Sequence, residues 1–134
     1  MHVAAIPVPG HLPTVTRGFS HAWRVGDLVF VSGQVGIDDQ GRVVGQGDMR
    51  AQAVQVFENL KTVLVAAGAG LDRIIKLTIF CTDAARAAEV REVRSQYLGD
   101  HWPASTLVIV QALGAPEWLV EIEAVAAVAP IRHA

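Results

Sequence analysis

LVEIEAVAAV, residues 119–128, is the stretch that decides the fold predicted from this sequence. Read as a β-strand, it places apolar residues on one face and two carboxylates on the other. Glu121 and Glu123 then lie about 6.5 to 7 Å apart, and they repel each other mildly unless water, a cation or a ligand group lies against them. We therefore expect a polar occupant on their face. The opposite face carries Val120, Ile122 and Ala124.

Length and charge limit the class of protein. The 134 residues are most simply one domain, residues 1–134, which is long enough to bury a core without disulfides or a structural metal. The net charge of -2 comes from mixed charges without a basic block, which argues against a nucleic-acid partner. No apolar run approaches the roughly 18 to 20 residues of a membrane span. We expect a soluble protein without a membrane partner.

The residue composition adds two expectations. The only cysteine, Cys81, cannot form an internal disulfide, and the N-terminus lacks a charged segment followed by a long apolar run, so a reducing, cytoplasmic setting fits best. Hydrophobic residues make up 51% of the chain and aromatic residues only 6%. Such a surplus of small apolar side chains exceeds what one small core normally uses and favours self-association.

The remaining sequence predicts strands and helices in a definite order. Asp48 is a suitable N-cap for the first helix, either Thr82 or Asp83 for the second, and glycines end both. Residues 1–17 carry no sustained period and should be an extended lead-in. The predicted elements are a hairpin of strands 22–25 and 28–34, a helix over 49–67, a strand over 74–81, a helix over 84–98, a strand over 103–111 and the strand 119–128 returning antiparallel beside it.

This order predicts an α+β layer with two helices packed on one face of a sheet. In the strand 74–81, alternation places Ile75, Leu77, Ile79 and Cys81 together. The other sheet face also carries apolar side chains, and a patch of that size is rare on a soluble monomer. Self-association through the uncovered face, as a closed dimer or ring, would bury it. If the helices cover the Val120 face, Glu121 and Glu123 lie near a subunit interface.

Several familiar sites are disfavoured. The five histidines are scattered and form no HExxH motif, so no metal site is expected. No Walker lysine accompanies the glycines of 41–47, Ser32 lacks a GxSxG context, and Cys81 fits a core position. His21 and His101 flank strands as either acid–base groups or structural histidines. Trp102 and Trp118 either line a cleft or fill the domain edge.

The glutamates leave two readings open. They form either a solvated strand face with a structural ion pair or, given their apolar neighbours, a partly buried carboxyl with a raised pKa in a pocket.

Five segments together resemble one protein family across residues 18–127. They are RVGDLVFVSGQVG (24–36), the AQ…ENLK helix (51–61), AAGAGLDRIIKLTIFCTD (66–83), Pro103-Ala104 and VEIEAVA (120–126). In this order they resemble the RidA/YjgF family, the reactive intermediate (enamine/imine) deaminases. The resemblance implies a chorismate-mutase-like α+β fold and a homotrimer with a small-molecule ligand cleft between subunits.

The resemblance also implies a chemistry. Active members hydrolyse 2-imino or 2-enamino acids to 2-oxo acids and ammonia without a cofactor. The catalytic glutamate of the family falls on Glu121, where a carboxyl that donates and removes protons suits the addition of water to C=N. Glu123 falls on the second glutamate of the motif, and Gly33 is expected among the substrate-binding residues.

Two positions depart from the family pattern. Where active members have an arginine that grips the substrate carboxylate, this chain has Ser105, whose hydroxyl cannot supply a charged, two-pronged contact. Phe19 stands in place of a tyrosine. We therefore expect a non-standard substrate, which need not be charged, with Ser105 and Thr106 hydrogen-bonding it and Phe19 and Trp118 as apolar lining. Arg17 or Arg24 would be substitute cations.

The changed positions leave rival functions open. One is a non-catalytic member of the family that binds a small metabolite or another protein in the same cleft. The other is a purely structural assembly module.

Overall fold

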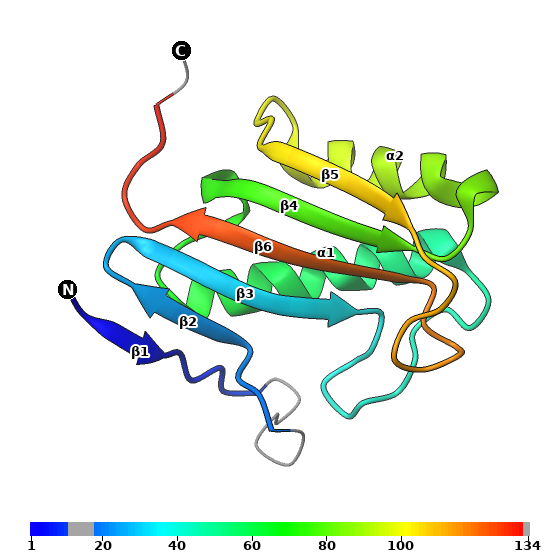
Figure 1. Ribbon diagram of the computed structural model, residues 1–134, viewed down its shortest axis with the longest axis horizontal. Coiled ribbons are helices and arrows are strands. Elements are labelled where there is room, and N and C mark those ends of the chain that lie inside the picture. The colour runs from blue at the N-terminus through cyan, green and yellow to red at the C-terminus, as the bar shows by residue number, and fades with distance from the viewer. Residues whose placement is uncertain (11–17, 133–134) are drawn as a thin grey trace.

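Strand β6 (Val120–Ala127) runs through the interior of a six-stranded sheet, between β3 and β4. The computed structural model describes residues 1–10 and 18–132. Val120, Ile122, Ala124 and Ala126 are buried, while Glu121 and Glu123 project from the other side of the strand. The helices therefore do cover the face predicted to be apolar, and the α+β layer expected from the sequence is confirmed (Figure 1).

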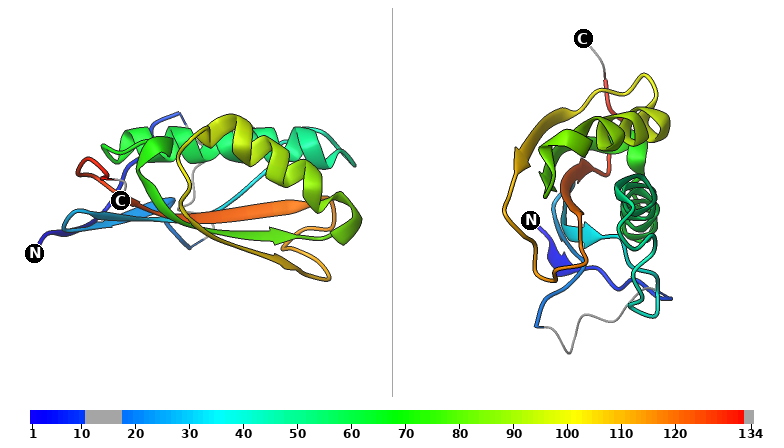
Figure 2. Two further views of the ribbon diagram at one scale, coloured as in Figure 1. Left: turned by 90° about the horizontal axis from the view of Figure 1, so that it is seen from above. Right: turned by 90° about the vertical axis from the view of Figure 1, so that its right-hand side faces the viewer.

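The sheet order is β1-β2-β3-β6-β4-β5, and both helices lie on one of its faces (Figures 1 and 2). All neighbouring strands are antiparallel except β4 and β5, which are parallel. The other elements are β1 (Val3–Ala5), β2 (Ala22–Val25), β3 (Leu28–Val35), α1 (Met49–Ala66), the 3-10 turn Leu71–Arg73, β4 (Ile74–Cys81), the 3-10 turn Ala84–Arg86, α2 (Ala87–Leu98) and β5 (Ala104–Ile109).

The predicted antiparallel pairing of the last two strands is wrong. Strand β4 lies between β5 and β6 and pairs with both. Helix α2 returns the chain to the end of the sheet where β4 began, so β5 runs parallel to β4. The connection after β5 then crosses to the far side of β4 before β6 begins. Adjacency in sequence is only a tendency for strands, and here the helical crossover overrides it.

The predicted cap Asp48 starts α1, whereas Asp83 caps the 3-10 turn that precedes α2. The Asp48 carboxylate accepts a hydrogen bond from the Ala51 N–H at 3.0 Å, and the Asp83 carboxylate accepts one from the Ala85 N–H at 3.0 Å. These bonds satisfy amide groups that a helix start leaves without partners. The second helix differs from its predicted range because its first residues form a 3-10 turn, and α2 proper starts at Ala87.

Two local expectations are corrected. The register shifts between Ile74 and Lys76, so Ile74 is buried whereas Ile75 is 38% exposed and does not share the face of Leu77. Such a bulge inserts one residue and reverses the alternation. The N-terminal lead-in includes a short strand, β1, paired with β2, while residues 11–17 lie outside the described part of the chain.

The face opposite the helices is called here the open face. It carries several apolar side chains that the single chain leaves exposed. Trp23 and Phe30, which pair across β2 and β3, are 47% and 45% exposed. Leu28 and Val108 add to the same face. Among the residues described, no helix combines the length and apolar character needed to span a membrane.

Candidate functional site

The carboxyl of Glu121 lies against the backbone of β3 at Gly33. The register between β3 and β6 is irregular between Val31 and Gln34, and beyond it Val35 lies opposite Glu121. A Cβ atom built on Gly33 would lie 2.1 Å from Oε1 of Glu121. A side chain at position 33 would therefore displace the Glu121 carboxyl from its present place, and glycine leaves this place open. Gly33 and Glu121, both predicted as site residues, therefore adjoin each other.

The Glu121 carboxyl is half-buried and has an altered acidity. Burial raises its pKa above the ordinary value, and the nearby charge of Glu123 raises this pKa further. Among the residues that the structure describes, none donates a hydrogen bond to this carboxyl or forms an ion pair with it. A carboxyl with a raised pKa and no internal partner can donate a proton to a ligand and take it back.

The segment before β2 runs alongside this corner. The Ser32 N–H donates to the His21 carbonyl at 2.8 Å, and the Ser32 hydroxyl donates to the Ser20 carbonyl at 2.6 Å. These bonds hold residues 20 and 21 next to the residue that precedes Gly33. Phe19 is 45% exposed and meets the His21 ring edge-on at 6.4 Å between ring centres. Phe19 is thus positioned as an apolar neighbour of the Gly33 segment.

Thr106 lies on the open face, in a row that leads to Glu123. Thr106 is opposite Thr78 of β4, and Thr78 is opposite Glu123 of β6. The Thr106 hydroxyl accepts a hydrogen bond from Lys76 Nζ at 2.6 Å. A hollow of about 160 Å³ lies in the middle of this face, lined by Phe30, Val31, Lys76, Thr78, Glu123, Ala124 and Val125.

Ser105 points to the other side of the sheet. It is opposite Leu77, which is buried under the helices, and its hydroxyl accepts a hydrogen bond from Nη1 of Arg94 on α2 at 3.2 Å. Ser105 also lines a cleft of about 270 Å³ between the end of α2 and the start of β5, together with Arg94, Ser95, Leu98, His101 and Trp102. Within one chain, Ser105 and Glu121 therefore project from opposite faces.

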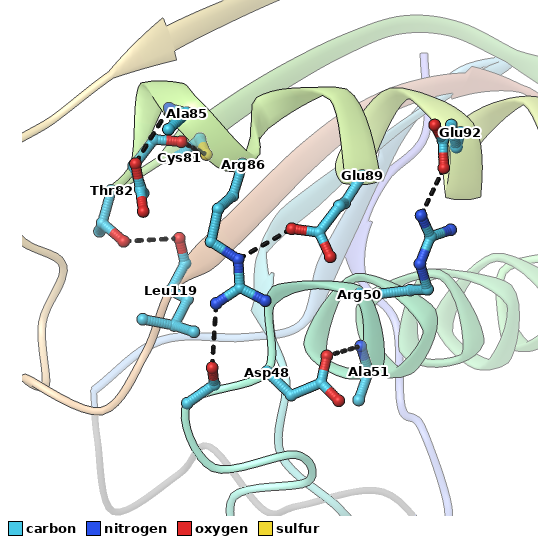
Figure 3. Close-up of polar contacts among 12 residues, drawn as sticks. Asp48, Arg50, Ala51, Cys81, Thr82, Ala85, Arg86, Glu89, Glu92 and Leu119 are labelled. Carbon is cyan, nitrogen blue, oxygen red and sulfur yellow. Dashed lines mark hydrogen bonds and ion pairs between the residues drawn. The ribbon is translucent and has the colours of Figure 1, made fainter.

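Trp118 belongs to the connection between β5 and β6. Its indole packs against Gly114, where a Cβ would lie 3.0 Å from the ring. Buried Gln52 anchors this connection, because its amide donates to the Glu117 carbonyl at 3.0 Å and accepts from the Leu119 N–H at 2.9 Å. Thr82 also donates to the Leu119 carbonyl (Figure 3). Trp118 thus lies in an anchored loop just before β6, and strand β4 separates β6 from the strand that carries Ser105.

One ion pair joins the two helices, and Arg86 connects the start of α2 to the segment before α1. Arg86 donates to Glu89 and to the Gly47 carbonyl, and Arg50 of α1 pairs with Glu92 of α2 (Figure 3). These contacts are exposed or half-exposed, so each contributes little to stability. They show that Arg86 and Arg50 already have carboxylate partners.

The other sequence candidates have different surroundings. Arg24 lies on β2, pairs with Asp27 at 3.8 Å and is separated from β5 by the width of the sheet, so it does not replace an arginine at position 105 within the chain. Arg17 lies outside the described residues. The His101 ring contacts the Ile74 carbonyl, and Cys81 is buried. Within residues 1–10 and 18–132, no three metal-binding side chains gather.

Sequence reasoning missed Arg94. The substitute cations expected from the sequence were Arg17 and Arg24, near the first strands, whereas the guanidinium that contacts Ser105 comes from α2. Its position within α2 would have been a usable signal, because α2 precedes β5 directly and must pack near it.

Comparisons with known proteins agree with the fold. The family model described as Endoribonuclease L-PSP matches residues 10–128. A RutC family protein of Pyrococcus abyssi is 38% identical over 108 residues, which cover 81% of this chain and 84% of that protein. The crystal structure of RidA from Psychrobacter sp. PAMC 21119 is 34% identical, with a TM-score of 0.84, over 92% of this chain and 98% of that one.

A further solved structure carries a ligand. The crystal structure of E. coli TdcF with bound serine has a TM-score of 0.83 and 32% identity, and the match covers 92% of this chain and 98% of that one.

Proposed function

The chain belongs to the endoribonuclease L-PSP family, which includes the RidA/YjgF proteins, and on this premise we propose that it hydrolyses small imines or enamines. The products are a carbonyl compound and ammonia. The observation that supports this most is the Glu121 carboxyl, which is half-buried, has a raised pKa and lies against Gly33. Such a group suits proton transfer to and from a ligand.

The reaction needs one water molecule and a group that moves protons. Protonated Glu121 donates its proton to the imine nitrogen, or to the β-carbon of the enamine, which makes the C=N carbon electrophilic. Water adds to that carbon, and the Glu121 carboxylate takes up the proton that water loses. Glu121 passes this proton to the nitrogen, ammonia leaves as the C=O bond forms, and the proton of the hydroxyl group returns to the Glu121 carboxylate, which restores the starting acid. Because hydrolysis consumes only water, the proposal requires no cofactor.

The placement of the side chains supports a site shared between copies of the chain. Ser105 and Glu121 project from opposite faces, so no single chain combines them around one small ligand. The exposed apolar residues Trp23 and Phe30 supply a surface for association. We propose a homotrimer in which the Ser105 side of one chain faces the Glu121 side of the next, forming three clefts. A cytoplasmic location is also part of the proposal and rests on the single buried Cys81.

A second candidate function is ligand binding without turnover. Ser105 replaces an arginine expected in active members, and the similar TdcF structure holds serine, an amino acid. A chain that binds such a metabolite in the same cleft would need Glu121 only as a hydrogen-bonding group.

Ammonia release tests the proposed reaction. The substrates are freshly generated 2-aminoacrylate and a neutral enamine, each measured against spontaneous hydrolysis. Glu121→Gln should lower the enzymatic rate by about 100-fold or more, which is the usual contribution of a general acid–base. Glu123→Gln is the comparison variant: it keeps the carboxyl at position 121 and removes only a nearby charge that raises its pKa, so it should lower the rate much less. Equal rates for wild type and Glu121→Gln would refute the reaction, and binding without turnover would favour the second function.

A further inference from the structure

Arg94 differs from Arg50 and Arg86 in its partners. Arg50 and Arg86 each contact a glutamate. Among the described residues, no carboxylate lies within 4.0 Å of the Arg94 guanidinium, and its hydrogen-bond partner is the neutral hydroxyl of Ser105 at 3.2 Å. A guanidinium offers five N–H donors, so this contact leaves most of them for a ligand.

The surroundings of Arg94 suit an anion. It lines the cleft of about 270 Å³ together with the hydroxyls of Ser95 and Ser105. Because the Ser105 oxygen accepts from Arg94, the Ser105 O–H is directed elsewhere and can donate to a second oxygen. The indole of Trp102 is 85% exposed and forms part of the wall, where it can cover the flat side of a small ligand. The volume suits a metabolite of a few carbon atoms better than a nucleotide.

We propose that Arg94 is the cation of this site and that it binds a carboxylate group of the ligand, with the Ser105 hydroxyl as a second donor. Strand β5 has Ser105 in place of an arginine, and helix α2 supplies a guanidinium next to that position. Arg94 and Ser105 line the same cleft. The proposal rests on the proposed function for the reaction, and it adds the residue of this chain that selects a ligand with a carboxylate. It replaces the expectation that Ser105 leaves the ligand without a charged contact.

Direct binding tests this inference separately from turnover. The probe is pyruvate, a small 2-oxo acid, compared by calorimetry with pyruvamide, which has the same shape without the negative charge. Wild type should bind pyruvate at least about 10-fold more tightly than pyruvamide, as expected for a charge-assisted contact. Arg94→Gln should remove that preference. Arg91→Gln, on the exposed side of the same helix, is the control and should keep it.

The exchange Arg94→Ser with Ser105→Arg gives a second readout. It returns the guanidinium to the strand and should recover at least part of the preference for pyruvate. Binding of pyruvate by Arg94→Gln as tight as by wild type, no preference in wild type, or no recovery in the exchange variant would overturn the proposal.

Kinetics separate this inference from the proposed function. If the wild type hydrolyses imino acids, Arg94→Gln should raise KM more than it lowers kcat, and an unchanged KM would refute Arg94 while leaving the reaction intact. Pyruvate binding that depends on Arg94 in a protein without turnover would refute the reaction while leaving the carboxylate site intact.

Discussion

Glu121 and Gly33 approach so closely that a Cβ on Gly33 would lie 2.1 Å from Oε1 of Glu121. The two residues come from β6 and β3, which are far apart in sequence and adjacent in the sheet. The irregular register of β3 brings the Gly33 backbone to the carboxyl, and the absence of a side chain leaves room for it. The Glu121 carboxyl is thus positioned next to the backbone of Gly33.

Gly33→Ala should therefore displace the Glu121 carboxyl. We expect a lower free energy of unfolding and loss of ammonia release, because either the methyl group or the carboxyl must move. The substitution is best made in two backgrounds and followed by chemical denaturation. In the Glu121→Ala background the destabilisation by Gly33→Ala should be smaller by about 1 kcal/mol, since the clashing atoms are gone. The same loss in both backgrounds would contradict the contact.

The acidity of Glu121 predicts how stability depends on pH. Burial and Glu123 raise the pKa of Glu121 above the ordinary 4.5, so the folded state holds this proton more tightly than the unfolded chain does. The resulting stabilisation is fully present below pH 4.5 and is lost as pH rises through the raised pKa.

Chemical denaturation of wild type and Glu121→Gln, from below pH 4.5 upward, measures how this stabilisation changes with pH. The free energy of unfolding of wild type, relative to that of Glu121→Gln, should fall as pH rises. Glu123→Gln should lower the pKa of Glu121 and shift the fall toward lower pH. Stability profiles that stay parallel for wild type and Glu121→Gln would show that the carboxyl titrates alike in both states.

Assembly should depend on the open face. Phe30→Glu places a charge among the exposed apolar residues of β3, where desolvating it on association is costly. Sedimentation velocity should then show a shift from the proposed trimer toward single chains. Val65→Glu is the matched control, because Val65 is 62% exposed on α1, on the helix side of the sheet. An assembly lost with Val65→Glu and kept with Phe30→Glu would place the interface on the helices instead.

Gln52 should be important for the connection that carries Trp118. Gln52→Leu removes the side-chain amide that bonds to the loop. The Leu119 N–H and the Glu117 carbonyl then lose their hydrogen-bond partner. We expect the free energy of unfolding to fall by about 1 to 3 kcal/mol, measured by chemical denaturation. Gln40→Leu, at an exposed position, should change it little. Equal small effects of both substitutions would mean that water replaces the lost bonds.

The helices and faces were predictable from short-range patterns. Asp48 caps α1 as expected and Asp83 caps the 3-10 turn before α2, because capping depends on residues within one turn. Alternation in the strand 119–128 separated the buried Ile122 from Glu121 and Glu123, because a strand turns successive side chains to opposite faces. The bulge at Ile75 could not be predicted in this way, since one inserted residue reverses the alternation without a sequence signal.

The neighbours of each strand were decided only by the tertiary structure. Alternation says which face a residue occupies and nothing about the strand beside it, so the position of β4 between β5 and β6 was missed. With that pairing corrected, Ser105 no longer adjoins Glu121.

The sequence alone thus determined the family pattern, the layer of helices and the carboxyl face of β6. The tertiary structure decided that Gly33 adjoins Glu121 and that Arg94 reaches Ser105. Both contacts join segments that only the folded sheet and its crossover helix bring together.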